Sequence, residues 1–119
     1  MTVIVDLTAA TICFLNTCFP VLIGKTTPVG IFDMNLRITA QEGYGGDIIQ
    51  FDETKDLVMA IHRVWLLNPK QRRPERLESS TVKDNTVTNG CINVKPDVYD
   101  KLKECCIRDK LIIIKGDLK

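Results

Sequence analysis

The chain has 119 residues, of which 45% are apolar and 26% charged, the mixture of an ordinary globular protein. This length suits one domain with its own hydrophobic core, so we expect residues 1–119 to fold as a single unit. Sixteen basic and fifteen acidic residues leave a formal charge of +1. That balance gives no general electrostatic reason to expect nucleic acid or an anionic membrane as a partner.

The apolar stretch over residues 2–24 lacks the form of a signal peptide or a membrane span. Its first basic residue comes only afterwards, at Lys25, and Asp6, Asn16 and Pro20 interrupt the run. We therefore predict no membrane span and no visible export signal. A cytoplasmic protein, a protein trimmed of its leader and a domain without its own signal all remain open.

The first third of the chain predicts strands. Residues 2–7, 11–15 and 18–23 are short, rich in β-branched or apolar side chains and separated by small or polar residues, which predicts a β-meander. In residues 25–33 a proline and a glycine lie two residues apart before an apolar run, which predicts a turn and then another strand.

The middle of the chain alternates between glycine-rich, apolar and basic segments. Residues 43–46 contain three glycines without phosphate-binding spacing and are expected to form a flexible flap. Residues 48–51 and 57–64 predict two more strands. Residues 68–84 are polar and basic, so we expect an excursion from the sheet that contains one short helix.

The clearest helix is predicted over residues 96–107. A proline suits its first position, and Val98, Leu102 and Cys105 recur at the spacing of one buried face. Residues 111–115 predict a closing strand. Many short strands with one late helix favour a mainly β sandwich or barrel-like domain.

The five cysteines, at positions 13, 18, 91, 105 and 106, form neither a regular disulfide framework nor a zinc-site pattern. An odd count leaves at least one thiol free. For Cys13 and Cys18 we expect simple core filling, because free cysteine is among the most buried residue types. For the adjacent Cys105 and Cys106 we expect one to pack inward and neither to have a role.

Cys91 is the candidate nucleophile. It directly follows Gly90, whose lack of a side chain lets a carbonyl approach, and consecutive backbone N–H groups at such a turn can stabilise an oxyanion. His62, the only histidine, is the candidate base, because a neighbouring imidazole can hold a cysteine as thiolate and later return the proton. The 29-residue separation (91 − 62) does not establish contact, so an inert loop cysteine and a structural histidine remain alternatives.

Residues 88–91, Thr-Asn-Gly-Cys, resemble the [Ser/Thr]-His-Gly-Cys motif of the L,D-transpeptidase catalytic domain, also called the YkuD-like domain. Residues 25–32 are similar to the family's Thr-Pro-x-Gly-x-Phe turn, and His62 lies where the family has its catalytic histidine. Asn89 departs from the motif, since most members have a second histidine there. Three further blocks look like a proteobacterial branch with a long loop before the cysteine: residues 45–54, 62–65 and 89–94.

The resemblance implies a mainly β fold, an L,D-transpeptidase-like β-sandwich with one helix after the catalytic cysteine. It implies that Cys91 attacks a peptidoglycan stem peptide before a terminal D-Ala, with His62 as general base and acid. The Arg63 backbone carbonyl would orient His62, and the backbone N–H groups of Gly90 and Cys91 would bind the oxyanion. Further oxyanion or substrate contacts are expected from Thr88, Asn89 and Asn93.

The resemblance also implies partners, an outcome and a location. An amine of a second stem would complete a 3-3 cross-link, and carbapenem-type β-lactams are expected inhibitors. No metal or organic cofactor is called for, and the periplasm or cell envelope is the expected location. An L,D-carboxypeptidase, D-amino-acid exchange by the same thioester, a catalytically weak wall-binding module and a cytoplasmic thiol protein unrelated to the wall remain alternatives.

Three arginines of the long loop, Arg72, Arg73 and Arg76, are candidates for docking a stem carboxylate, because a guanidinium binds carboxylates through two parallel bonds. A solvated run of basic residues is the alternative. Tyr44 and Trp65 are either walls of a groove or core residues, and core packing is expected for Trp65 because it follows a strand.

Overall fold

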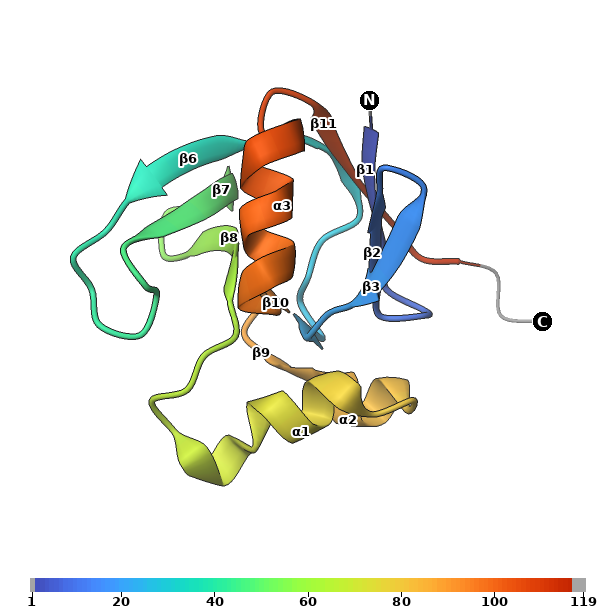
Figure 1. Cartoon of the computed structure of the whole chain (residues 1–119), viewed down its shortest axis with the longest axis vertical. Coiled ribbons are helices and arrows are strands. Elements are labelled where there is room, and N and C mark those ends of the chain that lie inside the picture. The colour runs from blue at the N-terminus through green and yellow to red at the C-terminus, as the bar shows by residue number, and fades with distance from the viewer. Residues whose placement is uncertain (1, 117–119) are drawn as a thin grey trace.

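The computed structural model describes residues 2–116, which fold around two β-sheets (Figure 1). The first sheet has the strand order β3-β2-β1-β11-β5. Its strands are β1 (Thr2–Asp6), β2 (Thr11–Phe14), β3 (Thr17–Pro20), β5 (Gly30–Asp33) and β11 (Lys110–Ile114). The predicted meander is confirmed, since β1, β2 and β3 pair antiparallel in sequence order. β11 pairs parallel with β1, so the first and last strands of the described chain lie side by side.

The second sheet has the order β10-β8-β7-β6. Its strands are β6 (Asn35–Ile38), β7 (Asp47–Glu53), β8 (Val58–Arg63) and β10 (Ile92–Val94). The strands predicted over residues 48–51 and 57–64 are confirmed as β7 and β8. The patterns did not predict β6 or β10. β6 is exposed along its whole length, so it carries no alternation of buried and exposed residues, and β10 is too short to show one.

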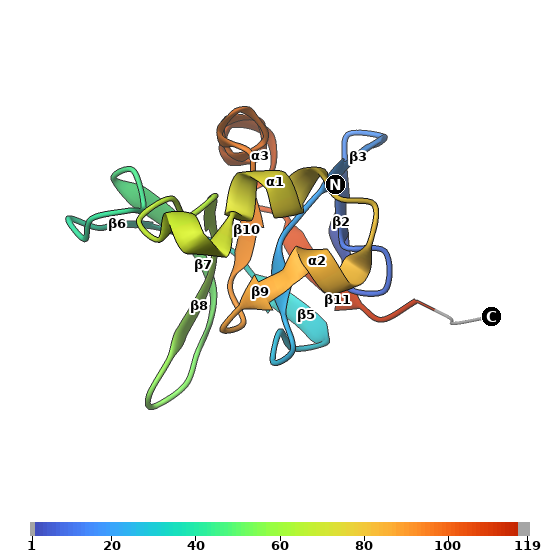
Figure 2. The ribbon, with the colours of Figure 1, turned by 90° about the horizontal axis from the view of Figure 1, so that it is seen from below.

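Two very short strands, β4 (Ile23–Gly24) and β9 (Thr86–Thr88), form a parallel pair beside the sheets. The polar excursion contains a 3-10 turn (Pro69–Gln71) and two short helices, α1 (Arg73–Glu78) and α2 (Val82–Asn85), rather than the single helix expected. These helices lie together at one end of the molecule, beside β9 (Figures 1 and 2).

The longest helix, α3 (Pro96–Cys106), is confirmed where the proline and the apolar spacing predict it. It stands between the side of the molecule that carries β6 to β8 and the side that carries β1 to β3 (Figure 1). Its buried face consists of Val98, Tyr99, Leu102 and Cys106. Cys105, predicted on that face, is exposed instead, because the buried stripe follows the i, i+4, i+8 positions.

The core joins side chains of both sheets and α3. Each sheet contributes fully buried aliphatic residues, such as Val5 and Ile113 from the first and Ile49 and Ile61 from the second. The alternation along β1, with Val3 and Val5 inward and Ile4 outward, is the period-2 pattern of a half-buried strand. Within residues 2–116, no helix has the length and apolar character needed to cross a bilayer.

The cysteine predictions need correction. Cys13 and Cys18 are not core residues: they lie opposite each other in the β2–β3 pair and are joined by a disulfide. The two-residue turn at Leu15 and Asn16, both with positive φ, sets that register.

A second disulfide joins the neighbouring residues Cys105 and Cys106. Their adjacency in the chain, rather than a shared face, brings the two sulfurs together: Cys106 is buried and Cys105 is exposed. Cys91 is the free cysteine, which confirms that at least one thiol is unpaired.

Replacing Leu102 by alanine should lower the free energy of unfolding by about 2–5 kcal/mol, because it leaves a cavity at a fully buried position of α3. Urea titration followed by circular dichroism measures the change. Glu104→Ala on the exposed face of the same helix is the matched control and should shift stability by less than about 0.5 kcal/mol. Equal effects of the two substitutions would contradict the assigned core.

Candidate active site

The parallel pairing of β8 with β10 brings the candidate nucleophile and base to one face. His62 lies opposite Asn93, and Ile61 lies opposite Ile92. Cys91 directly precedes β10, so the same register places it beside Ala60, two residues before His62 on β8. Because side chains alternate along a strand, Cys91 and Asn93 share the face that carries Ala60 and His62. Cys91 is predicted in a turn just before the helix that Pro96 opens, whereas in the structure β10 separates Cys91 from α3.

The loop that holds Cys91 is fixed by threonine hydroxyls. Thr88 Oγ1 donates to the Cys91 carbonyl at 2.6 Å and accepts the N–H of Gly90 at 3.2 Å. The buried Thr27 donates its hydroxyl to the Gly90 carbonyl at 3.0 Å, so the turn predicted over residues 25–33 supports this loop. Gly90 has φ +116°, and a Cβ there would lie 2.8 Å from the Met59 Cε atom. Position 90 therefore requires glycine.

The thiol of Cys91 is packed against the backbone of β8. Its Sγ lies 3.7 Å from the Val58 carbonyl oxygen, to which it donates. Burial raises the pKa of the Cys91 thiol, and the opposing effects of the Ala60 backbone and the Arg73 charge do not cancel this. The thiol is therefore protonated at neutral pH in the free protein.

The imidazole of His62 is nearly fully buried and held on both nitrogens. Its Nδ1 lies 2.7 Å from the Arg63 carbonyl oxygen, which can only accept, so Nδ1 carries the proton. Nε2 is then the basic nitrogen, and Asn93 Nδ2 donates to it at 3.3 Å. Burial lowers the pKa of His62 to about 4; the Arg63 carbonyl opposes the shift and the Arg73 charge adds to it. The free site thus favours a neutral imidazole and a neutral thiol, rather than the thiolate held by an imidazolium that is expected from the sequence.

Asn93 links His62 to the long loop. Its Oδ1 accepts the backbone N–H of Trp65 at 3.1 Å and Arg73 Nη1 at 2.9 Å. Both donors require an acceptor, so the Asn93 amide oxygen must face Trp65 and Arg73, and its amide nitrogen must face His62. Asn93 is fully buried, and this network therefore fixes the basic edge of His62.

Two cavities meet at Cys91 and His62. The larger, of about 350 Å³, is also lined by Trp65, Arg73 and Asn89. The smaller, of about 160 Å³, lies on the side of β6. Trp65 is half-buried and lines the larger cavity, so the expectation of a core tryptophan is wrong.

The boundary between the cavities is formed by residues that line both: Tyr44, Val58, His62 and Cys91. The Tyr44 ring lies 4.8 Å from the His62 ring, edge to face, and 4.9 Å from the Trp65 ring. Tyr44 belongs to the glycine-rich segment predicted as a flap, so this segment covers the imidazole.

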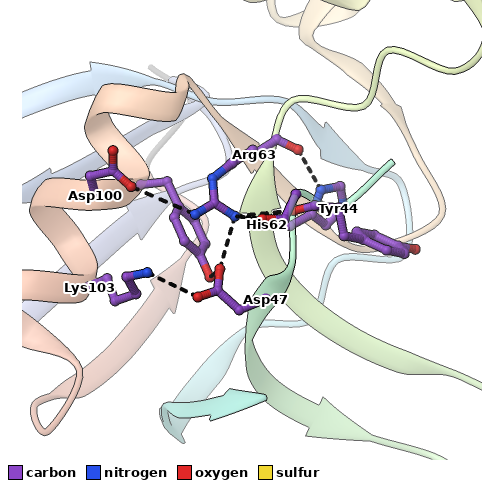
Figure 3. Close-up of polar contacts among 8 residues, drawn as sticks. Tyr44, Asp47, His62, Arg63, Asp100 and Lys103 are labelled. Carbon is purple, nitrogen blue, oxygen red and sulfur yellow. Dashed lines mark hydrogen bonds and ion pairs between the residues drawn. The ribbon is translucent and has the colours of Figure 1, made fainter. Parts of the chain in front are cut away.

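The side chain of Arg63 anchors that segment. Its Nη1 donates to the Tyr44 carbonyl at 3.1 Å and to Asp47 Oδ1 at 2.9 Å, and its Nη2 lies 3.7 Å from Asp100 (Figure 3). Arg63 therefore holds His62 through its carbonyl and the covering segment through its guanidinium.

Asp47 is the centre of this cluster, at the start of β7. Besides Arg63 it accepts the Tyr99 hydroxyl at 2.9 Å and Lys103 Nζ at 3.0 Å, both from α3 (Figure 3). Burial acts to raise the pKa of Asp47, but the hydrogen bonds from Lys103, Tyr99 and Arg63 outweigh burial and lower it. An ionised Asp47 thus ties α3 to the strand that carries His62.

The predicted site residues fall into two groups. Cys91, His62, Asn89, Thr88 and Arg73 line one cavity, with Gly90, Asn93 and Arg63 supporting them. The other docking candidates lie elsewhere: Arg76 lines a separate cavity, and Arg72 lines that cavity and one other. Two further residues are not predicted from the sequence: Arg37, which lines the smaller cavity, and Asp47. No local pattern marks them, because their partners come from other elements.

Stability should depend on pH through His62. Its folded pKa, about 4, lies below the unfolded value of about 6.5, so its contribution is complete above pH 6.5 and is lost as pH falls toward 4. The free energy of unfolding should be about 2 kcal/mol lower at pH 4.5 than at pH 7, as measured by urea titration. His62→Gln removes this contribution and serves as control. An equal pH dependence in both proteins would contradict the buried neutral imidazole.

Asp47→Asn should lower the free energy of unfolding by about 1–3 kcal/mol, because it takes the charge from a carboxylate that accepts three bonds while only 16% of its side chain is exposed. Thermal and urea unfolding measure the effect. Asp56→Asn, at an exposed position, is the matched control and should change stability by less than about 0.5 kcal/mol. A neutral effect of Asp47→Asn would show that the cluster does not support the fold.

No protein-family model and no curated protein sequence matches this chain. Solved structures do. An L,D-transpeptidase (Yku) from Stackebrandtia nassauensis matches 97% of this chain and 55% of its own length, with a TM-score of 0.61 and 16% sequence identity. L,D-transpeptidase 1 of Mycobacterium tuberculosis matches 94% of this chain and 60% of its own length, with a TM-score of 0.57 and 16% identity. The chain therefore spans less than two thirds of either structure. The predicted fold is confirmed: the chain has a mainly β, L,D-transpeptidase-like architecture.

Proposed function

We propose that this chain performs cysteine-dependent acyl transfer on peptidoglycan stem peptides, cleaving before a terminal D-Ala and forming 3-3 cross-links. One observation carries the proposal: Cys91 and His62 open together into two adjoining cavities, on a fold similar to that of L,D-transpeptidases. On this proposal residues 1–119 form one catalytic domain.

In the first step the hydrogen bond that Asn93 Nδ2 donates to His62 Nε2 breaks. Nε2 then takes the thiol proton of Cys91 while Sγ attacks the carbonyl carbon before the terminal D-Ala. General base catalysis suits the site, because the pKa shifts of both groups disfavour a resting thiolate. The resulting oxyanion is proposed to face the N–H groups of Gly90 and Cys91. The Gly90 N–H donates to Thr88 Oγ1 at 3.2 Å, a long bond that a charged oxygen can replace.

The tetrahedral intermediate collapses when His62 returns the proton to the departing amine, which releases D-Ala and leaves a thioester on Cys91. The imidazole is again neutral after this step. A neutral His62 can then accept a proton from the amine of a second stem as that amine attacks the thioester. The amide bond forms as the thioester C–S bond breaks, and His62 passes the proton to the departing Cys91 sulfur, which restores the thiol and the neutral imidazole.

The two cavities support transfer to a second substrate over hydrolysis. Both open onto Cys91, so a donor in one leaves the other for an acceptor. If water attacks the thioester instead, the protein is an L,D-carboxypeptidase, and if a free D-amino acid attacks, it exchanges the terminal residue. A weakly active wall-binding module is the remaining candidate, since Asn89 lines the larger cavity where the family motif has histidine.

The proposed location is the periplasm or cell envelope. Two disulfides, Cys13–Cys18 and Cys105–Cys106, support it, because disulfides persist mainly in oxidising compartments. Carbapenem-type β-lactams are proposed as inhibitors that acylate Cys91, the free cysteine of the chain.

Purified protein incubated with a disaccharide-tetrapeptide should release D-Ala, with cross-linked dimer as the second product, both measured by mass spectrometry. Cys91→Ala should reduce release to background, because no other thiol is free. His62→Gln should lower the rate by about 100-fold to 10,000-fold, the usual contribution of a general base.

The product distinguishes the candidates. Dimer indicates transfer, tripeptide without dimer indicates hydrolysis, and an exchanged terminal residue indicates amino-acid exchange. D-Ala release equal to that of Cys91→Ala would contradict the enzyme proposal. Intact mass after carbapenem addition gives an independent reading, because a covalent adduct on the wild type and none on Cys91→Ala locates the reactive thiol.

A further inference from the structure

Arg73 is a half-buried cation in the larger cavity, next to Cys91. Among the described residues that line this cavity, no side chain is a carboxylate, and His62 is neutral at physiological pH. Within residues 2–116, no ion pair joins Arg73 to an acidic residue. By contrast, Arg63 at the end of β8 forms ion pairs with both Asp47 and Asp100. Arg73 therefore differs from Arg63 in having no counter-ion of its own.

The guanidinium of Arg73 is held in position by neutral oxygens. Its Nη1 donates to Asn93 Oδ1 at 2.9 Å, and its Nε donates to Gln71 Oε1 at 2.8 Å. In the described part of the chain no hydrogen bond engages Nη2. These contacts orient the group without neutralising its charge, so a free edge of an oriented guanidinium remains for a ligand.

Burial lowers the pKa of Arg73, and the groups that oppose the shift are Cys91 and Tyr44, which carry charge only when ionised. The pKa of Tyr44 is raised by burial and by Cys91, so at neutral pH neither group supplies a negative charge. A cation desolvated without a counter-ion is stabilised by an incoming anion, and a carboxylate matches the planar geometry of a guanidinium.

We propose that Arg73 binds the C-terminal carboxylate of the acyl-donor peptide. The identity of that donor rests on the proposed function. In such a peptide the carboxylate of the leaving residue is separated by three covalent bonds from the carbon that Cys91 attacks, so both must occupy the same cavity. Arg73 meets that condition, whereas Arg72, its neighbour in the chain, does not line this cavity. The two arginines share a second cavity, which Cys91 does not line. Binding of the carboxylate by Arg73 would thereby select a scissile bond that lies one residue before the C-terminus of the donor peptide.

Calorimetry on the Cys91→Ala protein tests this without turnover. The probes are the same tetrapeptide with a free C-terminal carboxylate and with a C-terminal carboxamide. The acid should bind about 10-fold to 100-fold more tightly, the range of a hydrogen-bonded charge pair. In the Cys91→Ala, Arg73→Gln protein, the two peptides should bind alike. The same pair of measurements on Arg72→Gln, which removes an equal charge one residue away, should retain the preference for the acid.

Three results would overturn the proposal. They are no preference for the acid peptide with Arg73 intact, a preference that survives Arg73→Gln, and a loss of affinity in Arg73→Gln that is equal for the acid and the amide peptide. The last result would mean that Arg73 acts by supporting Asn93 and His62. Circular dichroism checks that Arg73→Gln is folded, and the comparison of acid with amide on Cys91→Ala does not depend on that variant. An acid preference with no D-Ala release from the wild type would leave carboxylate binding in place and reject the acyl-transfer proposal alone.

Discussion

The parallel pairing of β8 with β10 is the constraint on which the candidate site depends. The register that sets His62 opposite Asn93 also sets Cys91 on the same face of the sheet. A slip of one residue would turn the face of one strand away from that of the other, because side chains alternate with a period of two. Two residues far apart in the chain thus become neighbours through backbone hydrogen bonds. Other contacts support that register: α3 packs against β8, and the Thr27 hydroxyl donates to the Gly90 carbonyl.

Burial gives this site its electrostatic character. It lowers the pKa of His62 and raises that of Cys91, so both groups are neutral at rest, and Arg73 is the charged side chain of the larger cavity. Negative charge therefore enters the site with a ligand or arises during proton transfer. In a partly dry cavity each such charge interacts strongly with its neighbours. The bonds from Asn93 and from the Arg63 carbonyl fix the imidazole before any ligand arrives, and Nε2 exchanges the Asn93 donor for another when it accepts a proton.

Support for the site comes from residues outside the cavity. Asp47 gathers Arg63, Tyr99 and Lys103, and through Arg63 it also fixes the segment that carries Tyr44. Three elements that meet at one carboxylate are thereby coupled: β7, β8 and α3. A disturbance of this cluster would reach His62 through the Arg63 backbone and through the ring of Tyr44. The position of the base is set by packing and hydrogen bonds on every side.

The sequence by itself determined the mainly β class, the early meander, the strands β7, β8 and β11, and the helix α3. In each of these, local apolar spacing or a proline reports directly on burial and backbone geometry. It also singled out Cys91 and His62, because a Gly-Cys turn and a lone histidine are visible without a structure. Tertiary structure alone decided β10, the disulfides, the contacts of Asp47, and which of the three loop arginines shares a cavity with Cys91. Each of these depends on strand register or on contacts between distant segments, and spacing along the chain carries no information about either.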